Sequence, residues 1–166
     1  MASLNAFYVI SSSIRDGFVS ITDKDQVHQI RKVLRLRVGD MFLVLDGKGS
    51  EYECLVHTME SGSVRGQIVA TRSVDRETRI PITLYPSLIR RERFAMLLEK
   101  CTELGVTAFV PVIAERSIFQ TMTQNLAERW NRIIQESAEV VRRGMLPSLS
   151  IPQSLASAIE QTKGSD

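Results

Sequence analysis

The chain has 166 residues and a formal net charge of +2, and 43% of its residues are hydrophobic and 24% charged. This length suits one ordinary domain or two small ones, and the composition is typical of soluble globular proteins. The longest apolar runs, such as residues 41–45, are too short to span a membrane, and the N-terminal MASLNAFYVISSS lacks the basic segment and long apolar core of a signal peptide.

The first part of the chain is rich in predicted strands. Five segments have the short length and β-type composition of strands: residues 7–10, 18–21, 41–45, 52–59 and 64–74. The third and fourth form a predicted hairpin around Asp46-Gly-Lys-Gly49. Several short strands around one helix predict a small β-barrel over residues 1–75.

The helix of this barrel carries a local excess of positive charge in HQIRKVLRLRVGD, residues 28–40. Thr22 is its predicted N-cap, and four apolar residues at helical spacing form its predicted buried face: Val27, Ile30, Val33 and Leu34. Five basic residues lie between and just after them, with no acid from residue 26 to residue 39: His28, Arg31, Lys32, Arg35 and Arg37. Helical spacing places Arg31, Lys32 and Arg35 on one side, which suits phosphate contact. A solvated helix face without a ligand is the alternative.

Residues 72–79 contain a single large apolar residue and form a predicted linker. Strands and helices then alternate: strand 80–84, helix 91–104, strand 106–113, a helix from Asn125 to about residue 143 and a helix over residues 154–161. This order predicts a parallel sheet with crossover helices over residues 76–166, with Trp130 on a buried helix face. A parallel sheet is normally covered on both faces by more units, so we expect an incomplete α/β domain.

Several common chemistries find little support in the sequence. Asp46-Gly-Lys-Gly-Ser50 lacks the first glycine of a phosphate-binding loop and is interpreted as a hairpin turn. No Cys/His group has metal-ligand spacing, so we expect no metal, and a hydrolytic triad lacks its Gly-x-Ser-x-Gly motif. Cys54 and Cys101 lie far apart and are expected to be reduced thiols, which fits a cytoplasmic protein.

Three arginines of the second part stand at positions that favour ligands or helix ends. Arg116 follows a predicted buried strand, which places it at the carboxyl end of a parallel sheet, where ligands bind. Arg142 and Arg143 close the Trp130 helix, where cations also stabilise the helix dipole.

Four blocks of sequence in order resemble one family: VHQIRKVLRLRVGD (27–40), EKCTELGVTAFVPVIAERS (99–117), ERWNRIIQESAEVVRR (128–143) and MLPSL (145–149). The chain resembles the bacterial RsmE family, the ribosomal RNA small subunit methyltransferase E proteins of the SPOUT superfamily. The resemblance implies a two-domain α+β fold, with an N-terminal PUA-like RNA-binding β-barrel followed by an α/β SPOUT domain that contains a trefoil knot.

The resemblance also implies an activity. The family transfers a methyl group from S-adenosylmethionine to N3 of a uridine in small-subunit (16S) rRNA, in the cytoplasm and as a homodimer. Arg116 and Arg143 match its ERS and A-E-Q-S-x-R motifs, although Val140-Val141 stands where the family has Gln-Ser. The family's Gly-Pro-Glu-Gly-Gly loop and knot segment do not occur before Asp166. We therefore expect a C-terminally truncated chain that has no identified donor-binding residues and is inactive alone.

The sequence thus predicts an rRNA uridine-N3 methyltransferase, in which the His28–Arg37 segment and Arg143 contact rRNA. Arg116 is the candidate catalytic residue, because a fixed cation can stabilise the charge that develops on the uracil carbonyl oxygens. No residue is assigned as general base. The alternatives are a non-catalytic RNA-binding module and a small-molecule-binding α/β domain without an RNA role.

Overall fold

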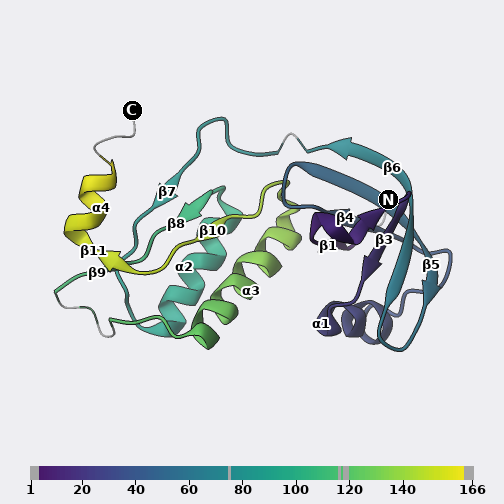
Figure 1. Ribbon diagram of the computed structural model, residues 1–166, viewed down its shortest axis with the longest axis horizontal. Helices are drawn as coiled ribbons and strands as arrows, with labels where there is room; N and C mark the ends of the chain where they lie inside the picture. Colours follow the sequence, from purple (N-terminus) through teal and green to yellow (C-terminus); the bar gives the residue numbers. More distant parts are fainter. Residues whose placement is uncertain (1–3, 75, 116, 118–119, 163–166) are drawn as a thin grey trace. The chain divides into compact units, whose positions relative to one another are not determined.

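The computed structural model describes residues 4–74, 76–115, 117 and 120–162, and Figure 1 shows the chain as a ribbon. The chain forms two compact units. The first unit comprises Met1–Glu77 and Arg142–Met145, and the second comprises Thr78–Val141 and Leu146–Asp166. In the described part of the chain, none of the helices combines the length and apolarity that crossing a bilayer requires.

The first unit is built on a six-stranded sheet in the order β1-β4-β5-β6-β3-β2. β1 runs parallel to β4, and the other neighbours are antiparallel. The elements are β1 (Ala6–Tyr8), η1 (Ser11–Ser13), β2 (Ile14–Arg15), β3 (Phe18–Ile21), α1 (Lys24–His28), η2 (Gln29–Val33), β4 (Met41–Leu45), β5 (Ser50–Met59) and β6 (Val64–Ser73). All five predicted strands are confirmed, whereas β2 was not predicted, because a two-residue strand shows no periodicity.

The inward side chains of this sheet share one apolar core with α1 and η2. Phe7 and Phe42 meet edge to face, with ring centroids 6.2 Å apart at 70°. Val27 and Ile30 are buried in the same cluster, as predicted. The sheet passes so close to Phe42 that β6 needs a glycine there: a Cβ on Gly66 would lie 2.5 Å from a carbon of the Phe42 ring.

The turn between β4 and β5 is the predicted hairpin turn. A carboxylate oxygen of Asp46 accepts hydrogen bonds from the backbone N–H of Lys48 at 2.8 Å and of Ser50 at 3.0 Å. Because these amides serve the turn itself, they are not presented to a phosphate group.

The second unit contains two small parallel sheets, in the orders β10-β8-β7 and β11-β9. Its elements are β7 (Thr83–Leu84), α2 (Arg91–Glu103), β8 (Ala108–Phe109), β9 (Val112–Ile113), α3 (Gln124–Val141), β10 (Ser148–Leu149), β11 (Gln153–Ser154) and α4 (Leu155–Thr162). The parallel pairing and the three helices are confirmed. The single strand predicted over 106–113 is wrong: Pro111, which has no N–H to donate, separates β8 from β9, and the two strands pair in different sheets.

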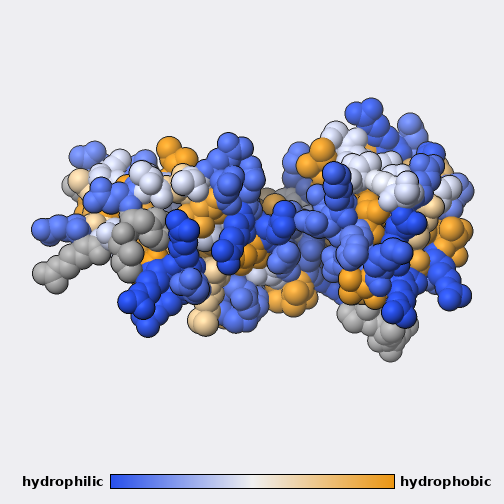
Figure 2. Space-filling model, turned by 90° about the horizontal axis from the view of Figure 1, so that it is seen from below, coloured by the Kyte–Doolittle hydropathy of each residue, from blue (hydrophilic) through white to orange (hydrophobic). Residues whose placement is uncertain are grey.

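Helices α2 and α3 enclose the core of the second unit. The rings of Phe94 and Trp130 stack with centroids 4.3 Å apart at 28°, and Trp130 is 1% exposed, which confirms its predicted burial. Leu104, the last residue of the predicted helix 91–104, is 78% exposed, because α2 ends at Glu103 and the chain turns away at Leu104 and Gly105. Figure 2 shows one face of the chain, on which hydrophobic residues form separate groups among hydrophilic ones.

Candidate functional site

The basic segment, residues 28–37, is held on the first unit by the apolar residues between its charges. Val27 and Ile30 are buried, and Leu34 and Leu36 pack against the same core. Four basic side chains of the segment are exposed: His28, Lys32, Arg35 and Arg37. The buried apolar residues therefore anchor the backbone of the segment, and its basic side chains are exposed to solvent.

The backbone of this segment differs from the predicted regular helix. Asp23, rather than Thr22, is the N-cap: its carboxylate accepts hydrogen bonds from the N–H of Asp25 and Gln26 at 3.1 and 3.0 Å. The α-helix ends at His28, a π-helical turn follows, and Arg35 has a positive φ of 53°. The predicted α-helical face that joins Arg31, Lys32 and Arg35 is therefore wrong. Val33 is also 64% exposed rather than buried.

Arg31 differs from its basic neighbours because its side chain is engaged. Nη1 of Arg31 donates a hydrogen bond to the backbone oxygen of Ser61, at 2.9 Å. Ser61 lies in the turn between β5 and β6, so this bond ties the basic segment to the end of that hairpin. The remaining donors of a guanidinium can still reach a phosphate.

The basic segment ends in a tight turn at residues 37–40, and this turn is hydrogen-bonded to β5. The N–H of Arg37 donates to a carboxylate oxygen of Asp40 at 2.6 Å, and the N–H of Asp40 donates to the Arg37 oxygen at 3.0 Å. Gly39 N–H then bonds to the oxygen of Val56, and Val56 N–H bonds to the oxygen of Asp40, both at 2.9 Å. The end of the basic segment is thereby fixed beside Val56 of β5.

The second candidate region is the turn after β9. Arg116 itself lies outside the described residues. Next to it, Ser117 closes a turn: its hydroxyl accepts from the N–H of Ala114 at 2.9 Å, and its own N–H donates to the Ala114 oxygen at 3.0 Å. The catalytic role of Arg116 stays a prediction.

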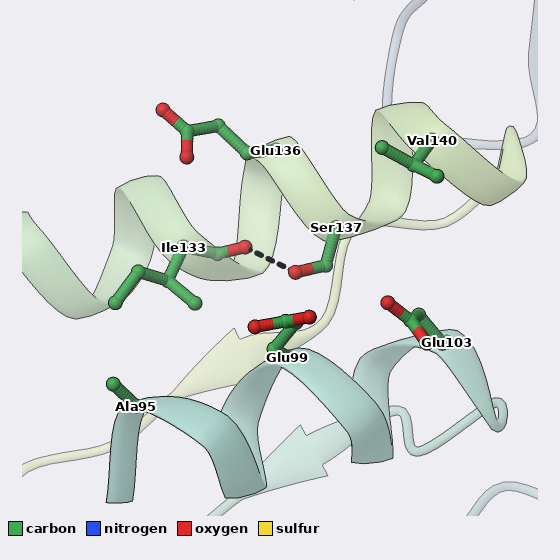
Figure 3. Close-up of a pocket in the computed structure, with 7 residues that line it drawn as sticks. All are labelled: Ala95, Glu99, Glu103, Ile133, Glu136, Ser137 and Val140. Atoms are coloured by element: carbon green, nitrogen blue, oxygen red, sulfur yellow. Dashed lines mark hydrogen bonds between the residues drawn. The ribbon is translucent and has the colours of Figure 1, made fainter. Parts of the chain in front are cut away.

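A cleft of about 240 Å³ lies between α2 and α3 (Figure 3). Three glutamates line it, with four smaller or apolar residues: Glu99, Glu103 and Glu136, with Ala95, Ile133, Ser137 and Val140. The Ser137 hydroxyl donates to the Ile133 oxygen at 2.6 Å, and Lys100 pairs with Glu99 at 2.7 Å and with Glu103 at 3.0 Å. A carboxylate-lined cleft repels phosphate, so it is unsuited to the RNA backbone.

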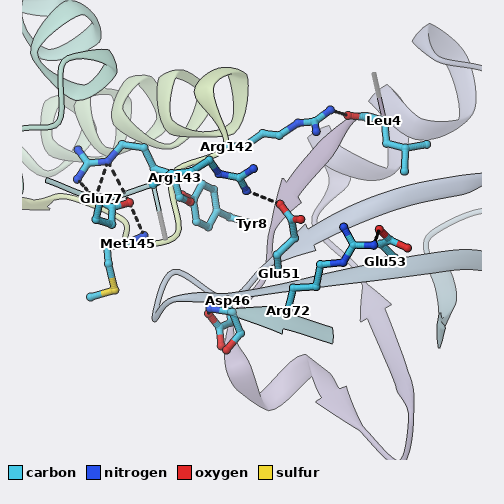
Figure 4. Close-up of polar contacts among 12 residues, drawn as sticks. Leu4, Tyr8, Asp46, Glu51, Glu53, Arg72, Glu77, Arg142, Arg143 and Met145 are labelled. Atoms are coloured by element: carbon cyan, nitrogen blue, oxygen red, sulfur yellow. Dashed lines mark hydrogen bonds and ion pairs between the residues drawn. The ribbon is translucent and has the colours of Figure 1, made fainter. Parts of the chain in front are cut away.

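Arg143 is buried in the first unit rather than displayed on its surface (Figure 4). Its guanidinium forms an ion pair with Glu77 at 2.5 Å, its backbone oxygen accepts from the Tyr8 hydroxyl, and neighbouring Arg142 donates to the Leu4 oxygen. The structure thus gives the Arg143 side chain a contact within the protein, and its predicted contact with RNA stays a prediction.

The two thiols are free and poorly suited to chemistry as thiolates. Burial raises the pKa of the Cys54 thiol to about 12 and also raises the pKa of Cys101, so both are protonated at neutral pH. Among the described residues, no three His, Cys, Asp or Glu side chains come close enough together to hold a metal ion.

One group of outward-facing side chains was not predicted as a candidate site. Phe18, His57 and Arg65 lie together on the outer face of β3, β5 and β6. The alternation of residues 64–74 does predict that Arg65 faces outward. The contact between Arg65 and Phe18 depends on the register of strands far apart in sequence, which the sequence alone does not reveal.

Two family models match the chain, one on each part. Residues 21–69 match an RNA methyltransferase PUA domain, and residues 76–166 match an RNA methyltransferase domain. Together with the structure, these matches confirm the predicted fold class, a PUA-like domain followed by an α/β domain of the SPOUT type.

Among curated relatives, the chain is similar to several proteins named ribosomal RNA small subunit methyltransferase E. The one from Synechocystis is 35% identical over 156 residues, which cover 94% of this chain and 50% of the relative. The one from Aquifex aeolicus is 31% identical over 162 residues, which cover 94% and 68%. The one from Bacillus subtilis is 26% identical, with 86% and 57% covered. The chain thus spans about half the length of the first and third of these relatives.

Solved structures of two similar proteins share the fold. The ribosomal RNA small subunit methyltransferase E of Neisseria gonorrhoeae, bound to S-adenosyl methionine, superimposes with a TM-score of 0.86 at 26% identity, and covers 96% of this chain and 65% of that one. A predicted RNA methyltransferase of Thermotoga maritima gives a TM-score of 0.76 at 26% identity, with 90% and 66% covered.

Proposed function

Because the chain belongs to the ribosomal RNA small subunit methyltransferase E family, we propose that it is part of an S-adenosylmethionine-dependent enzyme that methylates N3 of a uridine in small-subunit rRNA. The family matches on both parts of the chain support the enzyme class. The observation that carries the RNA role is the basic segment, since it displays exposed cations from a buried apolar anchor. We further propose that residues 1–75 form the RNA-binding domain and residues 76–166 belong to the catalytic domain.

The basic segment is proposed to hold the rRNA backbone. His28, Lys32, Arg35 and Arg37 are exposed, and the Arg31 guanidinium is held at the β5–β6 turn by its bond to Ser61. Exposed cations on a rigid base attract phosphates and fix the register of the strand, without reading its sequence. A methyltransferase depends on a fixed register of the RNA on its surface, because one base of a long RNA must reach the methyl donor.

Arg116 is proposed to act on the uracil ring. The N3–H is an imide proton, and its loss spreads negative charge onto the two flanking carbonyl oxygens. A guanidinium at the carboxyl end of the sheet can stabilise that charge, which favours the nucleophilic form of N3. S-adenosylmethionine supplies the electrophilic methyl group when it is bound. Ala114 and Ser117, on either side of Arg116 in the sequence, are joined by two hydrogen bonds.

The RNA role is tested by changing Arg31, Lys32 and Arg35 together to Ala. We expect weaker binding to small-subunit rRNA fragments and a salt dependence that is flatter by about one unit of log–log slope for each lost phosphate contact. The matched control changes three exposed arginines of the second unit, Arg90, Arg93 and Arg129, to Ala, which removes the same formal charge. An unchanged slope in the triple variant, with its thermal melt preserved, would exclude phosphate contact by this segment.

A polypeptide of these 166 residues is proposed to bind RNA without measurable binding of S-adenosylmethionine. The resemblance places the glycine-rich donor loop of the family in a segment that these residues do not contain, and the cleft between α2 and α3 is lined by glutamates instead. Calorimetry with S-adenosylmethionine tests the proposal. One-to-one binding in the micromolar range would show that the described residues already form a donor site.

The whole protein is further proposed to act as a cytoplasmic homodimer without a metal ion. Exposed apolar side chains of the second unit support self-association: Ile80, Leu104, Val140, Ile151 and Leu155. Sedimentation velocity at several protein concentrations measures the oligomeric state, and a monomer at all concentrations would contradict the dimer.

A further inference from the structure

Three side chains form an aromatic and cationic group on the outer face of the first unit's sheet. The Phe18 and His57 rings have centroids 5.2 Å apart at 59°, and the guanidinium carbon of Arg65 lies 4.1 Å from the centroid of the Phe18 ring. Phe18 is half-buried, whereas His57 and Arg65 are exposed. We call these three residues the stacking platform.

Strand register fixes the platform on the outer face. On β3, Phe18 pairs with Gln67 of β6 and Ser20 pairs with Arg65. The alternate residues Val19, Ile21, Val64 and Gly66 are buried, so their neighbours Phe18, Ser20 and Arg65 must face outward. On β5, a register shift between Val56 and Thr58 brings His57 to the same face as Phe18. The platform is therefore part of the sheet rather than of a loop.

The outward positions that adjoin the platform in the strand register carry basic or neutral residues. Arg15 on β2 pairs directly with Phe18, and Ser20, Thr58 and Gln67 occupy the neighbouring outward positions. Among the described residues, no carboxylate forms an ion pair with Arg65. A lone cation–aromatic pair is a common feature of protein surfaces. Here a second aromatic ring and a second arginine join it, which is a combination typical of nucleic-acid binding.

Backbone hydrogen bonds place the platform's strands beside the basic segment. The turn that ends this segment bonds through Gly39 and Asp40 to Val56, the residue before His57. At the other end, Arg31 bonds to Ser61 in the turn that joins β5 to β6, the strand of Arg65. The basic segment packs on the inner side of the sheet and the platform lies on its outer face, so an RNA strand that meets both would pass around the β5–β6 hairpin to which the segment is bonded.

We propose that the Phe18–His57–Arg65 platform stacks an unpaired base of the RNA whose backbone the basic segment holds. Bases stack on exposed imidazole rings and on guanidinium planes. The Phe18 ring contacts both the His57 ring and the Arg65 guanidinium and so holds them in position. The platform thus selects single-stranded over duplex RNA, because the bases of a duplex are already stacked on one another. This inference rests on the proposed RNA-binding function and adds a base contact to its phosphate contacts.

The test compares an oligouridine strand with an abasic ribose-phosphate strand of the same length, bound to the complete chain. The variant Arg65→Lys keeps the charge and removes the planar group, and Phe18→Leu keeps the apolar volume and removes the ring. Each is expected to weaken oligouridine binding by about 5- to 100-fold. Abasic binding and the salt slope should stay as in the unmodified chain. Arg72→Lys is the matched control, since Arg72 lies on the same strand but pairs with Glu53.

The outcomes separate this inference from the proposed function. If the unmodified chain binds oligouridine no better than the abasic strand, or if Arg65→Lys weakens both strands equally, the platform does not stack a base, although phosphate binding stands. If the unmodified chain binds neither strand nor rRNA fragments, both the RNA role and the platform are wrong. His57→Ala gives an independent reading, because it removes a ring without changing the Phe18–Arg65 pair.

Discussion

The guanidinium of Arg143 forms an ion pair with the carboxylate of Glu77, although the two residues are 66 positions apart in the chain. Nη2 and Nε of Arg143 donate to Oε2 of Glu77 at 2.5 and 3.2 Å, and Oε1 of Glu77 accepts from the N–H of Met145 at 3.1 Å. The Arg143 side chain is 5% exposed and that of Glu77 19%. The pair ties Arg142–Met145, the segment that follows α3, to Glu77 within the first unit, two residues beyond the predicted barrel.

Breaking this pair is predicted to destabilise the protein. Glu77→Gln leaves the buried Arg143 without its counter-charge, and we expect a loss of about 2–4 kcal/mol, somewhat below the cost for a fully buried pair because Glu77 is partly exposed. Urea denaturation measures the loss. Adding Arg143→Met should recover part of it, because no unpaired charge then remains.

The matched control for this prediction is Glu53→Gln. Glu53 pairs with Arg72, whose side chain is 63% exposed, so we expect a change below about 1 kcal/mol. Equal losses in the Glu77 and Glu53 variants would contradict the structural importance of the buried pair.

The same pair predicts how stability depends on pH. Burial alone would raise the pKa of Glu77, but the hydrogen bonds from Arg143 and Met145, with the positive charge of Arg143, outweigh it and lower the pKa below its ordinary value of 4.5. Because the pKa is lower in the folded state than in the unfolded state, the pair stabilises the fold above about pH 4.5. This contribution is lost as the pH falls through the lowered value.

The measurement is the difference in unfolding free energy between the unmodified chain and Glu77→Gln. We expect this difference to be constant from about pH 7 to pH 5 and to shrink towards pH 3. A difference that stays constant down to acid pH would mean that the Glu77 carboxylate is not stabilised by the pair.

Most strands and helices could be predicted from the sequence, because their signals are local. The hairpin of β4 and β5 has a short apolar run, Met41–Leu45, followed by an Asp-Gly turn, and α2 has an apolar stripe ended by Gly105. The parallel strands β10 and β11 could not be predicted in this way. Each is two residues long and exists only through pairing with β8 or β9, which the sequence does not encode locally.

The candidate site was predictable in composition but not in shape. The acid-free run from His28 to Arg37 is visible in the sequence. The π-helical turn and the left-handed backbone conformation of Arg35 are not. Arg143 shows a second limit of local reasoning. Its position at the end of a helix favours a surface cation, but its partner Glu77 lies far away in sequence, and only the fold brings the two together.

The stack of Phe94 on Trp130 predicts that α2 and α3 depend on each other. Trp130→Ala removes a ring that is 1% exposed and leaves a cavity, so we expect a loss of roughly 3–5 kcal/mol. Met96→Ala on the exposed face of α2 is the control, with an expected change within about 0.5 kcal/mol.

Fluorescence provides an independent check, because Trp130 is the only tryptophan of the chain. We expect blue-shifted emission that iodide quenches poorly in the folded state and readily in urea. Red-shifted, freely quenched emission from the native chain would show that α3 is not packed against α2.

The last prediction concerns Gly66, which lets β6 pass over the Phe42 ring. A Cβ at this position would lie 2.5 Å from Cζ of Phe42 and 3.0 Å from Cγ1 of Val19, both within the core. Since these side chains are buried, they cannot move without disturbing their neighbours, and Gly66→Ala is expected to cost about 1–3 kcal/mol. Gly62→Ala is the control, because a Cβ there meets no atom within 4 Å.

A second substitution separates the steric clash from a general effect of alanine in the strand. Phe42→Leu shortens the side chain that the new methyl group meets, so the loss in the double variant should be smaller than the sum of the two single losses. Additive losses would mean that the clash is relieved in another way, for example by movement of β6. Such a movement would also displace Arg65, the neighbour of Gly66, from the Phe18 ring, so it should weaken oligouridine binding while leaving the salt slope unchanged.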